Sequence, residues 1–133
     1  MLKLFEVSGF KNFRDCVTLD FSDVRDYKFN TACVSGNLIS KLIIYGKNAI
    51  GKTNLGLAVF DIVSHLSAKN VTPNLYDYYL NVESLNDYAE FHYVFSFSDH
   101  EVDYRYRKDE KQNLIYERLS INDKLLFDFD YQK

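Results

Sequence analysis

Several residue types are scarce in this chain of 133 residues, which has no tryptophan, one proline and two cysteines. Cys16 and Cys33 are too few and too far apart for a cysteine-ligated metal site, so we expect two reduced thiols packed as small apolar groups. The N-terminal residues hold no long apolar run, so no signal peptide is predicted. No apolar run is long enough to span a bilayer, and we therefore expect a cytoplasmic protein with no membrane partner.

The chain also has only a small excess of charge of one sign. The formal net charge of -3 gives no general basic surface for nucleic acid, although it leaves room for a local basic patch. The length fits one domain, and a hydrophobic share of 47% is enough to fill a core. Tyrosine and phenylalanine are abundant, at eleven each. Rings that fill the core of a sheet are the favoured explanation, and a surface that stacks on bases is the alternative.

The most informative pattern that is present lies at residues 46–53. GKNAIGKT fits the phosphate-binding pattern G-x-x-x-x-G-K-[ST]. The apolar, partly β-branched segment Lys41–Tyr45 before it predicts a buried parallel strand. After it, apolar residues at helical spacing predict a helix from Thr53 to about Ser67. Strand, loop and helix is the arrangement that the pattern needs, and a glycine-rich turn without a ligand is the disfavoured alternative.

Each residue type in this loop has a physical role. Gly46 and Gly51 allow a tight turn and a close approach to a phosphate. Successive backbone N–H groups and the start of a helix form a concavity that suits an anion. We expect Lys52 to be the catalytic residue that reaches the β- and γ-phosphates, and the Thr53 hydroxyl to ligate Mg²⁺. The expected nucleotide-binding residues of the loop are Gly46, Lys47, Asn48, Ala49, Ile50, Gly51, Lys52, Thr53 and Asn54.

Alternating patterns predict strands on both sides of this core. Residues 2–8 and 16–21 are expected to form a hairpin, and residues 22–40 an irregular segment. Residues 69–86 are loop-like, with a short helical piece at about 75–80. After residue 87 the period of two predicts an antiparallel meander of four strands, broken at 98–100, 108–113 and 122–124. The expected fold class is α/β (α+β), with a strand–phosphate loop–helix core and an antiparallel β-meander.

The turn GFKNFR at residues 9–14, followed by YGKNAIGKTNL at 45–55, resembles the N-terminal lobe of SMC/RecF-like ABC-class P-loop ATPases. This group includes DNA-repair ATPases and the OLD, Septu and PARIS-type ATPases of anti-phage defence. The resemblance covers nearly the whole chain and implies a P-loop core with an N-terminal hairpin at 1–68 and an antiparallel subdomain at 87–130. It also implies that Asn12, Phe13 and Arg14 contact the nucleotide. A solvated Arg14 is about equally favoured, and a core position is favoured for Phe13.

Elements of the resembled families are missing from this sequence. We find no LSGG-like signature, no apolar strand that ends in Asp-Glu, and no switch histidine. In those families such elements follow a long insertion, so we expect them beyond residue 133, in a longer protein. Asp128, at the acidic end of residues 125–130, is a minor alternative for an acid linked to Mg²⁺. His65, His92 and His100 show no ligand spacing and are expected on helix and strand surfaces.

The resemblance implies ATP and Mg²⁺ as cofactors and ATP-driven formation of a homodimer or larger assembly, in DNA repair or anti-phage defence. An effector nuclease or DNA would be the further partner. We expect ATPase activity to be weak or absent without the missing elements. The alternative is a scaffold or partner-binding module that holds nucleotide structurally. A small kinase or GTPase is disfavoured, because neither an N-K-x-D motif nor a lid-like arginine cluster is present.

Overall fold

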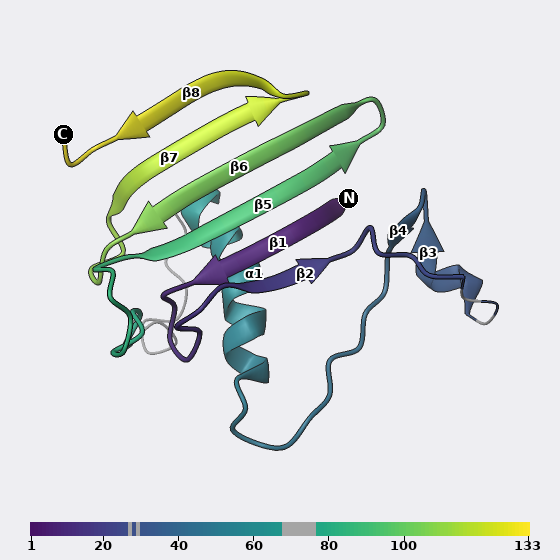
Figure 1. Ribbon diagram of the computed structural model, residues 1–133, viewed down its shortest axis with the longest axis horizontal. Helices are drawn as coiled ribbons and strands as arrows, with labels where there is room; N and C mark the ends of the chain where they lie inside the picture. Colours follow the sequence, from purple (N-terminus) through teal and green to yellow (C-terminus); the bar gives the residue numbers. More distant parts are fainter. Residues whose placement is uncertain (27, 29, 68–76) are drawn as a thin grey trace.

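A six-stranded antiparallel sheet dominates the computed structural model, which describes residues 1–26, 28, 30–67 and 77–133 (Figure 1). Its strand order is β2-β1-β5-β6-β7-β8. The strands are β1 (Leu2–Ser8), β2 (Val17–Asp20), β5 (Ala89–Phe97), β6 (His100–Lys108), β7 (Leu114–Ile121) and β8 (Lys124–Asp130). The helix α1 (Lys52–Ser67) lies against one face of the sheet. A 3₁₀ turn, η1 (Thr31–Cys33), precedes a small separate ribbon of β3 (Val34–Ser35) and β4 (Leu38–Ile39).

The expected α/β fold class is wrong. Every strand pair in the described residues is antiparallel, and the fold is mostly β with one helix. The segment Lys41–Tyr45 is not a strand but an irregular, exposed stretch, in which Ile43 is 86% and Tyr45 89% accessible to solvent. A parallel strand is normally covered on both faces, and nothing in the described residues covers this segment. Its apolar composition predicted burial that the described chain does not supply.

Other elements agree with the sequence patterns. β1 has the expected bounds, β2 pairs back on it antiparallel, and the four meander strands pair in sequence order. The helix begins one residue earlier than expected, at Lys52. Of the helical piece expected at 75–80, the first two residues lie outside the described residues, and Asp77–Leu80 are not helical.

The core lies between the inner face of the sheet and α1. Alternate residues of the strands point to this face, and most of them are rings. Phe5, Phe91, Tyr93 and Tyr106 are each at most 1% exposed. The Tyr93 hydroxyl donates to the carbonyl oxygen of Ala58 at 2.8 Å, so a polar tip inside the core has a partner on the helix. The ring-rich composition is therefore explained by core packing.

A buried ionic group fixes α1 to the sheet. Asp61, in the middle of the helix, is 1% exposed and accepts hydrogen bonds from Lys108 Nζ at 2.7 Å and from Tyr106 at 2.8 Å on its Oδ2. Its Oδ1 accepts from the Tyr79 hydroxyl at 3.0 Å. These bonds tie the helix to β6 and to the segment before β5. Because a buried charge needs its partners, they also restrict how the helix can rotate or slide.

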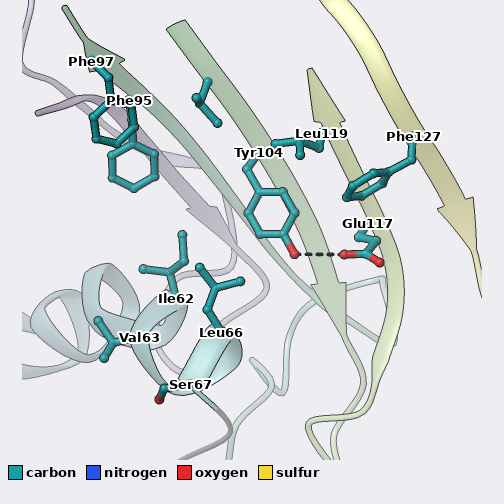
Figure 2. Close-up of a pocket in the computed structure, with 11 residues that line it drawn as sticks. Ile62, Val63, Leu66, Ser67, Phe95, Phe97, Tyr104, Glu117, Leu119 and Phe127 are labelled. Atoms are coloured by element: carbon teal, nitrogen blue, oxygen red, sulfur yellow. Dashed lines mark hydrogen bonds between the residues drawn. The ribbon is translucent and has the colours of Figure 1, made fainter. Parts of the chain in front are cut away.

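The helix covers only part of the inner face. An apolar hollow of about 730 Å³ opens between its C-terminal half and strands β5–β8 (Figure 2). Figure 2 shows Ile62 and Leu66 of α1 facing Tyr104 and Leu119 across it. Glu117 is the acidic residue of its lining and accepts hydrogen bonds from Tyr104 at 3.0 Å and from Tyr131 at 2.5 Å. The apolar lining leaves hydrophobic side chains in contact with solvent.

Candidate phosphate-binding loop

Residues 46–53 connect the exposed segment 41–45 to the first turn of α1. Two residues of the loop have left-handed backbone conformations, Ala49 at φ 63° and Gly51 at φ 97°. Within the described ranges, the amides of residues 47–51 donate to no backbone carbonyl. These amides and the free N–H groups of the helix start are the donors that an anion needs.

The Lys52 side chain folds back over the loop and contacts its first residues. Its Nζ donates to the carbonyl oxygens of Gly46 at 2.9 Å and Lys47 at 2.6 Å. The ammonium group is therefore held over the loop by two neutral acceptors. Phosphate oxygens would be stronger acceptors at the same place, because their negative charge adds an electrostatic attraction to the hydrogen bonds of the ammonium group.

A cavity of about 430 Å³ lies along the loop and the start of α1. Thr53 is exposed there in the first helical turn, where its hydroxyl can reach a ligand. Ile50 instead lies across Gly46, since a β-carbon at position 46 would come within 2.3 Å of its Cδ1. The cavity is lined by Asn48, Ala49, Gly51, Lys52, Thr53 and Asn54.

The turn between β1 and β2 brings Asn12 to this loop. Asn54 Nδ2 donates to Asn12 Oδ1 at 2.7 Å. The Asn12 side chain lies so close to Gly51 that a β-carbon at position 51 would come within 2.2 Å of its Nδ2. Glycine is therefore needed at position 51 both for the positive φ and for this contact. Of the three turn residues expected at the nucleotide, the structure places Asn12 at the loop.

Phe13 and Arg14 do not line the cavity. The Phe13 ring is partly buried and packs against the core, which is the position favoured from the sequence. Arg14 is more than half exposed, and its Nε lies 3.9 Å from Asp15. The loop residue Lys47 is exposed and contacts Lys52 only through its own carbonyl oxygen.

A second cavity, of about 510 Å³, adjoins the loop and was not anticipated from the sequence. Asn54 lines both cavities. Lys11 Nζ donates to the carbonyl oxygen of Asp77 at 2.8 Å, and partial burial lowers the pKa of Lys11. The sequence around Tyr78 predicted a loop with a short helical piece, and no local pattern indicates that it folds back beside Asn12. The lining is Lys11, Asn12, Asn54, Asp77, Tyr78, Leu80, Asn81, Val82 and Glu83.

Two other expectations lie away from the loop. His92, expected on the strand surface, is 7% exposed, and its ring nitrogens lie 2.8 Å from Glu6 and 3.1 Å from Asp103. Its hydrogen bond lowers the pKa of Glu6. The surface expectation for His92 was wrong because carboxylates on neighbouring strands cover it. Asp128 lies on the edge strand β8, opposite Arg118. Among the described residues, no group of histidine, cysteine and acidic residues is arranged to hold a metal ion.

No protein-family model matches the chain, and a search of curated proteins gives no match either. In the part of the chain that the structure describes, no helix has the length and apolar character needed to cross a membrane.

Proposed function

We propose that the chain binds ATP with Mg²⁺ at residues 46–54, as the nucleotide-binding lobe of an SMC/RecF-like ABC-class ATPase. The observation that carries the proposal is the arrangement of Lys52. Its ammonium group is held over a loop of free backbone amides, at the start of a helix, with the Asn12–Asn54 pair beside it. Backbone amides, a helix start and one lysine are the groups that bind a polyphosphate.

In this proposal the phosphates lie along the loop cavity. The amides of residues 47–51 and of the first helical turn donate to the phosphate oxygens, and Lys52 leaves its carbonyl acceptors for the β- and γ-phosphates. Mg²⁺ would be held by the Thr53 hydroxyl and by phosphate oxygens, and would neutralise charge on the phosphates. The second cavity, beside Asn12 and Tyr78, is the place for the nucleoside, because Asn54 lines both cavities.

Exposed apolar side chains support the role of a lobe that packs on a further protein layer. Three apolar side chains of the helix are exposed: Phe60 is 67%, Val63 57% and Leu66 67% exposed, and the last two line the hollow beside strands β5–β8. Leu42, Ile43 and Ile44 add to this exposed apolar surface. Large apolar patches on soluble proteins usually mark contact sites. ATP would favour assembly through this surface. DNA repair and anti-phage defence are proposed on the sequence likeness alone.

Calorimetric titration of wild-type protein with Mg²⁺ and ATP tests the binding. We expect Lys52→Ala to weaken binding at least tenfold, since it removes a charged donor worth about 1.5–3 kcal/mol. Lys47→Ala is the matched control, because it removes an exposed lysine of the same loop and leaves the carbonyl in place. Equal affinity of Lys52→Ala and wild type would refute the site, and so would equal loss in both variants.

The rate of ATP hydrolysis and the preference for ATP over ADP distinguish an ATP-driven assembly from a scaffold that only holds nucleotide. We identify no residue in the described chain that orients a water molecule at the loop, so ATP hydrolysis should stay well below about 1 s⁻¹, a normal rate for complete enzymes of this chemistry. For an ATP-driven assembly, light scattering should report a larger species with ATP than with ADP. Equal binding of ATP and ADP with no change in size would favour the nucleotide-holding scaffold.

A further inference from the structure

The outer face of the sheet, opposite α1, carries an arginine cluster formed by Arg105 and Arg107 of β6 and Arg118 of β7. Arg105 and Arg118 are directly opposite each other in the strand register. Together with Asp103, Tyr116 and Ser120 the cluster lines a polar cavity of about 230 Å³. Tyr104 and Tyr106, which alternate with these arginines, point to the inner face. The cluster is therefore separated from the phosphate-binding loop by the sheet.

The positive charge of the cluster is only partly balanced. Glu90 serves two guanidinium groups, with Arg105 Nη1 at 3.2 Å and Arg107 Nε at 2.5 Å. Asp103 already lies 3.1 Å from His92 Nε2. Arg118 makes no ion pair within 4.0 Å in the described ranges. Like charges directly opposite each other on neighbouring strands are destabilising. The carboxylate paired with Arg105 is shared with Arg107, and none lies within 4.0 Å of Arg118 in the described ranges.

One member of the cluster is held rigidly. The Arg107 guanidinium lies between two rings, 4.6 Å from the centroid of Tyr88 and 4.7 Å from that of Tyr116. Glu90 engages its Nε, and its terminal nitrogens make no further hydrogen bond to the described residues. A stacked guanidinium loses little conformational freedom when it binds an oxyanion.

We propose that the arginine cluster binds a tetrahedral dianion, a phosphate either free or as the terminal monoester of a small metabolite. Planar guanidinium groups match phosphate oxygens with paired donors. Three of them line one cavity, and Ser120, whose hydroxyl can act as a further donor, lines the same cavity. A dianion between Arg105 and Arg118 would offset the repulsion between these two like charges.

The surrounding charges favour a small ligand over a nucleic acid. Asp128 and Asp130 of β8 lie directly opposite Arg118 and Tyr116. Glu6 and Asp103 lie on the other side, next to His92. A long polyanion laid across this face would meet these carboxylates as well as the arginines, and its binding would be weakened by repulsion. A single phosphate group is small enough to lie within the cavity, and Asp103 is the one carboxylate among these that lines it.

The test uses the Lys52→Ala protein, so that phosphate bound at the loop does not contribute. We expect added inorganic phosphate to shift the amide NMR signals of residues 105, 107 and 118. Arg118→Gln in the same background should weaken phosphate binding about tenfold, the loss of one charged hydrogen-bond pair. Arg118 forms no ion pair, so this change leaves the internal ion pairs intact, which an unfolding curve checks. Arg25→Gln is the matched control, because this side chain is 73% exposed and lies far in sequence from the cluster. It should leave phosphate binding unchanged.

Three further arms complete the experiment. Binding of glycerol phosphate should strengthen as pH rises from about 5 to 7.5, since the second ionisation of a phosphate monoester has a pKa near 6, whereas sulfate should show no such rise. Glycerol phosphate that binds more tightly than inorganic phosphate identifies a metabolite ligand, and equal binding identifies free phosphate. The proposal is overturned if phosphate leaves the signals of the three arginines unchanged, or if Arg118→Gln and Arg25→Gln bind equally. Tighter binding of duplex DNA through Arg118 would also overturn it.

Discussion

The buried pair of Asp61 and Lys108 gives the sharpest prediction about stability. Replacing Asp61 by alanine leaves the Lys108 ammonium, 5% exposed, without its carboxylate, and it removes the acceptor of the Tyr79 and Tyr106 hydroxyls. Replacing Lys108 by methionine has a different consequence. Asp61 then keeps both tyrosine hydroxyls as donors, so its charge stays partly compensated.

The magnitudes follow from these partners. Breaking a buried ion pair by removing one member costs about 3–5 kcal/mol, and we place Asp61→Ala at the upper end of this range. Lys108→Met should cost less, about 2–3 kcal/mol, because the remaining charge is hydrogen-bonded. Combining Asp61→Leu with Lys108→Met removes both charges, and the double variant should be at least as stable as Lys108→Met alone.

Urea unfolding followed by circular dichroism measures these free energies, with the midpoint and slope compared between variants. Glu101→Ala is the control, because it breaks the half-exposed pair with Lys3, for which about 0–1 kcal/mol is expected. Similar losses in Asp61→Ala and Glu101→Ala would contradict the account of a buried network that holds α1. The account would also be contradicted if the double variant Asp61→Leu, Lys108→Met were less stable than Asp61→Ala.

Three further predictions concern the turn glycines and His65. Gly9→Ala should destabilise more than Gly36→Ala in urea unfolding: both have positive φ, but only at Gly9 does a β-carbon meet another atom, the Tyr88 carbonyl oxygen at 2.4 Å. Gly51→Ala should displace Asn12, strain the backbone at its positive φ and weaken ATP binding, whereas unchanged affinity would show that Asn12 does not contribute to the site. Burial, followed by the charge of Lys108, lowers the pKa of His65 below 6.5, so the unfolded chain takes up a proton that the fold does not. Stability should therefore be full above pH 6.5 and fall as pH drops below it, and His65→Phe should show a flatter pH profile.

The sequence predicted local elements well because their signals are local. The alternation in Phe91–Phe97 and its successors needs only side chains two positions apart, and the helix needs only the spacing of Leu55, Ala58 and Ile62. The prediction of a buried strand at 41–45 was wrong because apolar composition indicates that a segment is suited to burial but does not say what covers it. The ring-rich meander and the aromatic core follow from the same alternation.

The candidate site was predicted in part for a similar reason. The loop pattern placed Lys52 and Gly51 directly, whereas the second cavity depends on Tyr78 folding back beside Asn12, a contact between distant parts of the chain. The partners of His92 and the pairing of Arg105 with Arg118 depend on strand register, which is set across the sheet. Asp61 looked like any polar residue on a helix until Lys108 and Tyr106 were placed against it.

The most direct test of the central claim is amide NMR of the wild-type protein with added ATP and Mg²⁺. The account predicts that the largest shifts fall on residues 46–54 and on Asn12, and that Lys52→Ala requires at least tenfold more nucleotide to produce them while the rest of the spectrum stays unchanged. Shifts confined to other parts of the chain, or a spectrum unaffected by millimolar nucleotide, would contradict the proposal that residues 46–54 hold a nucleoside triphosphate.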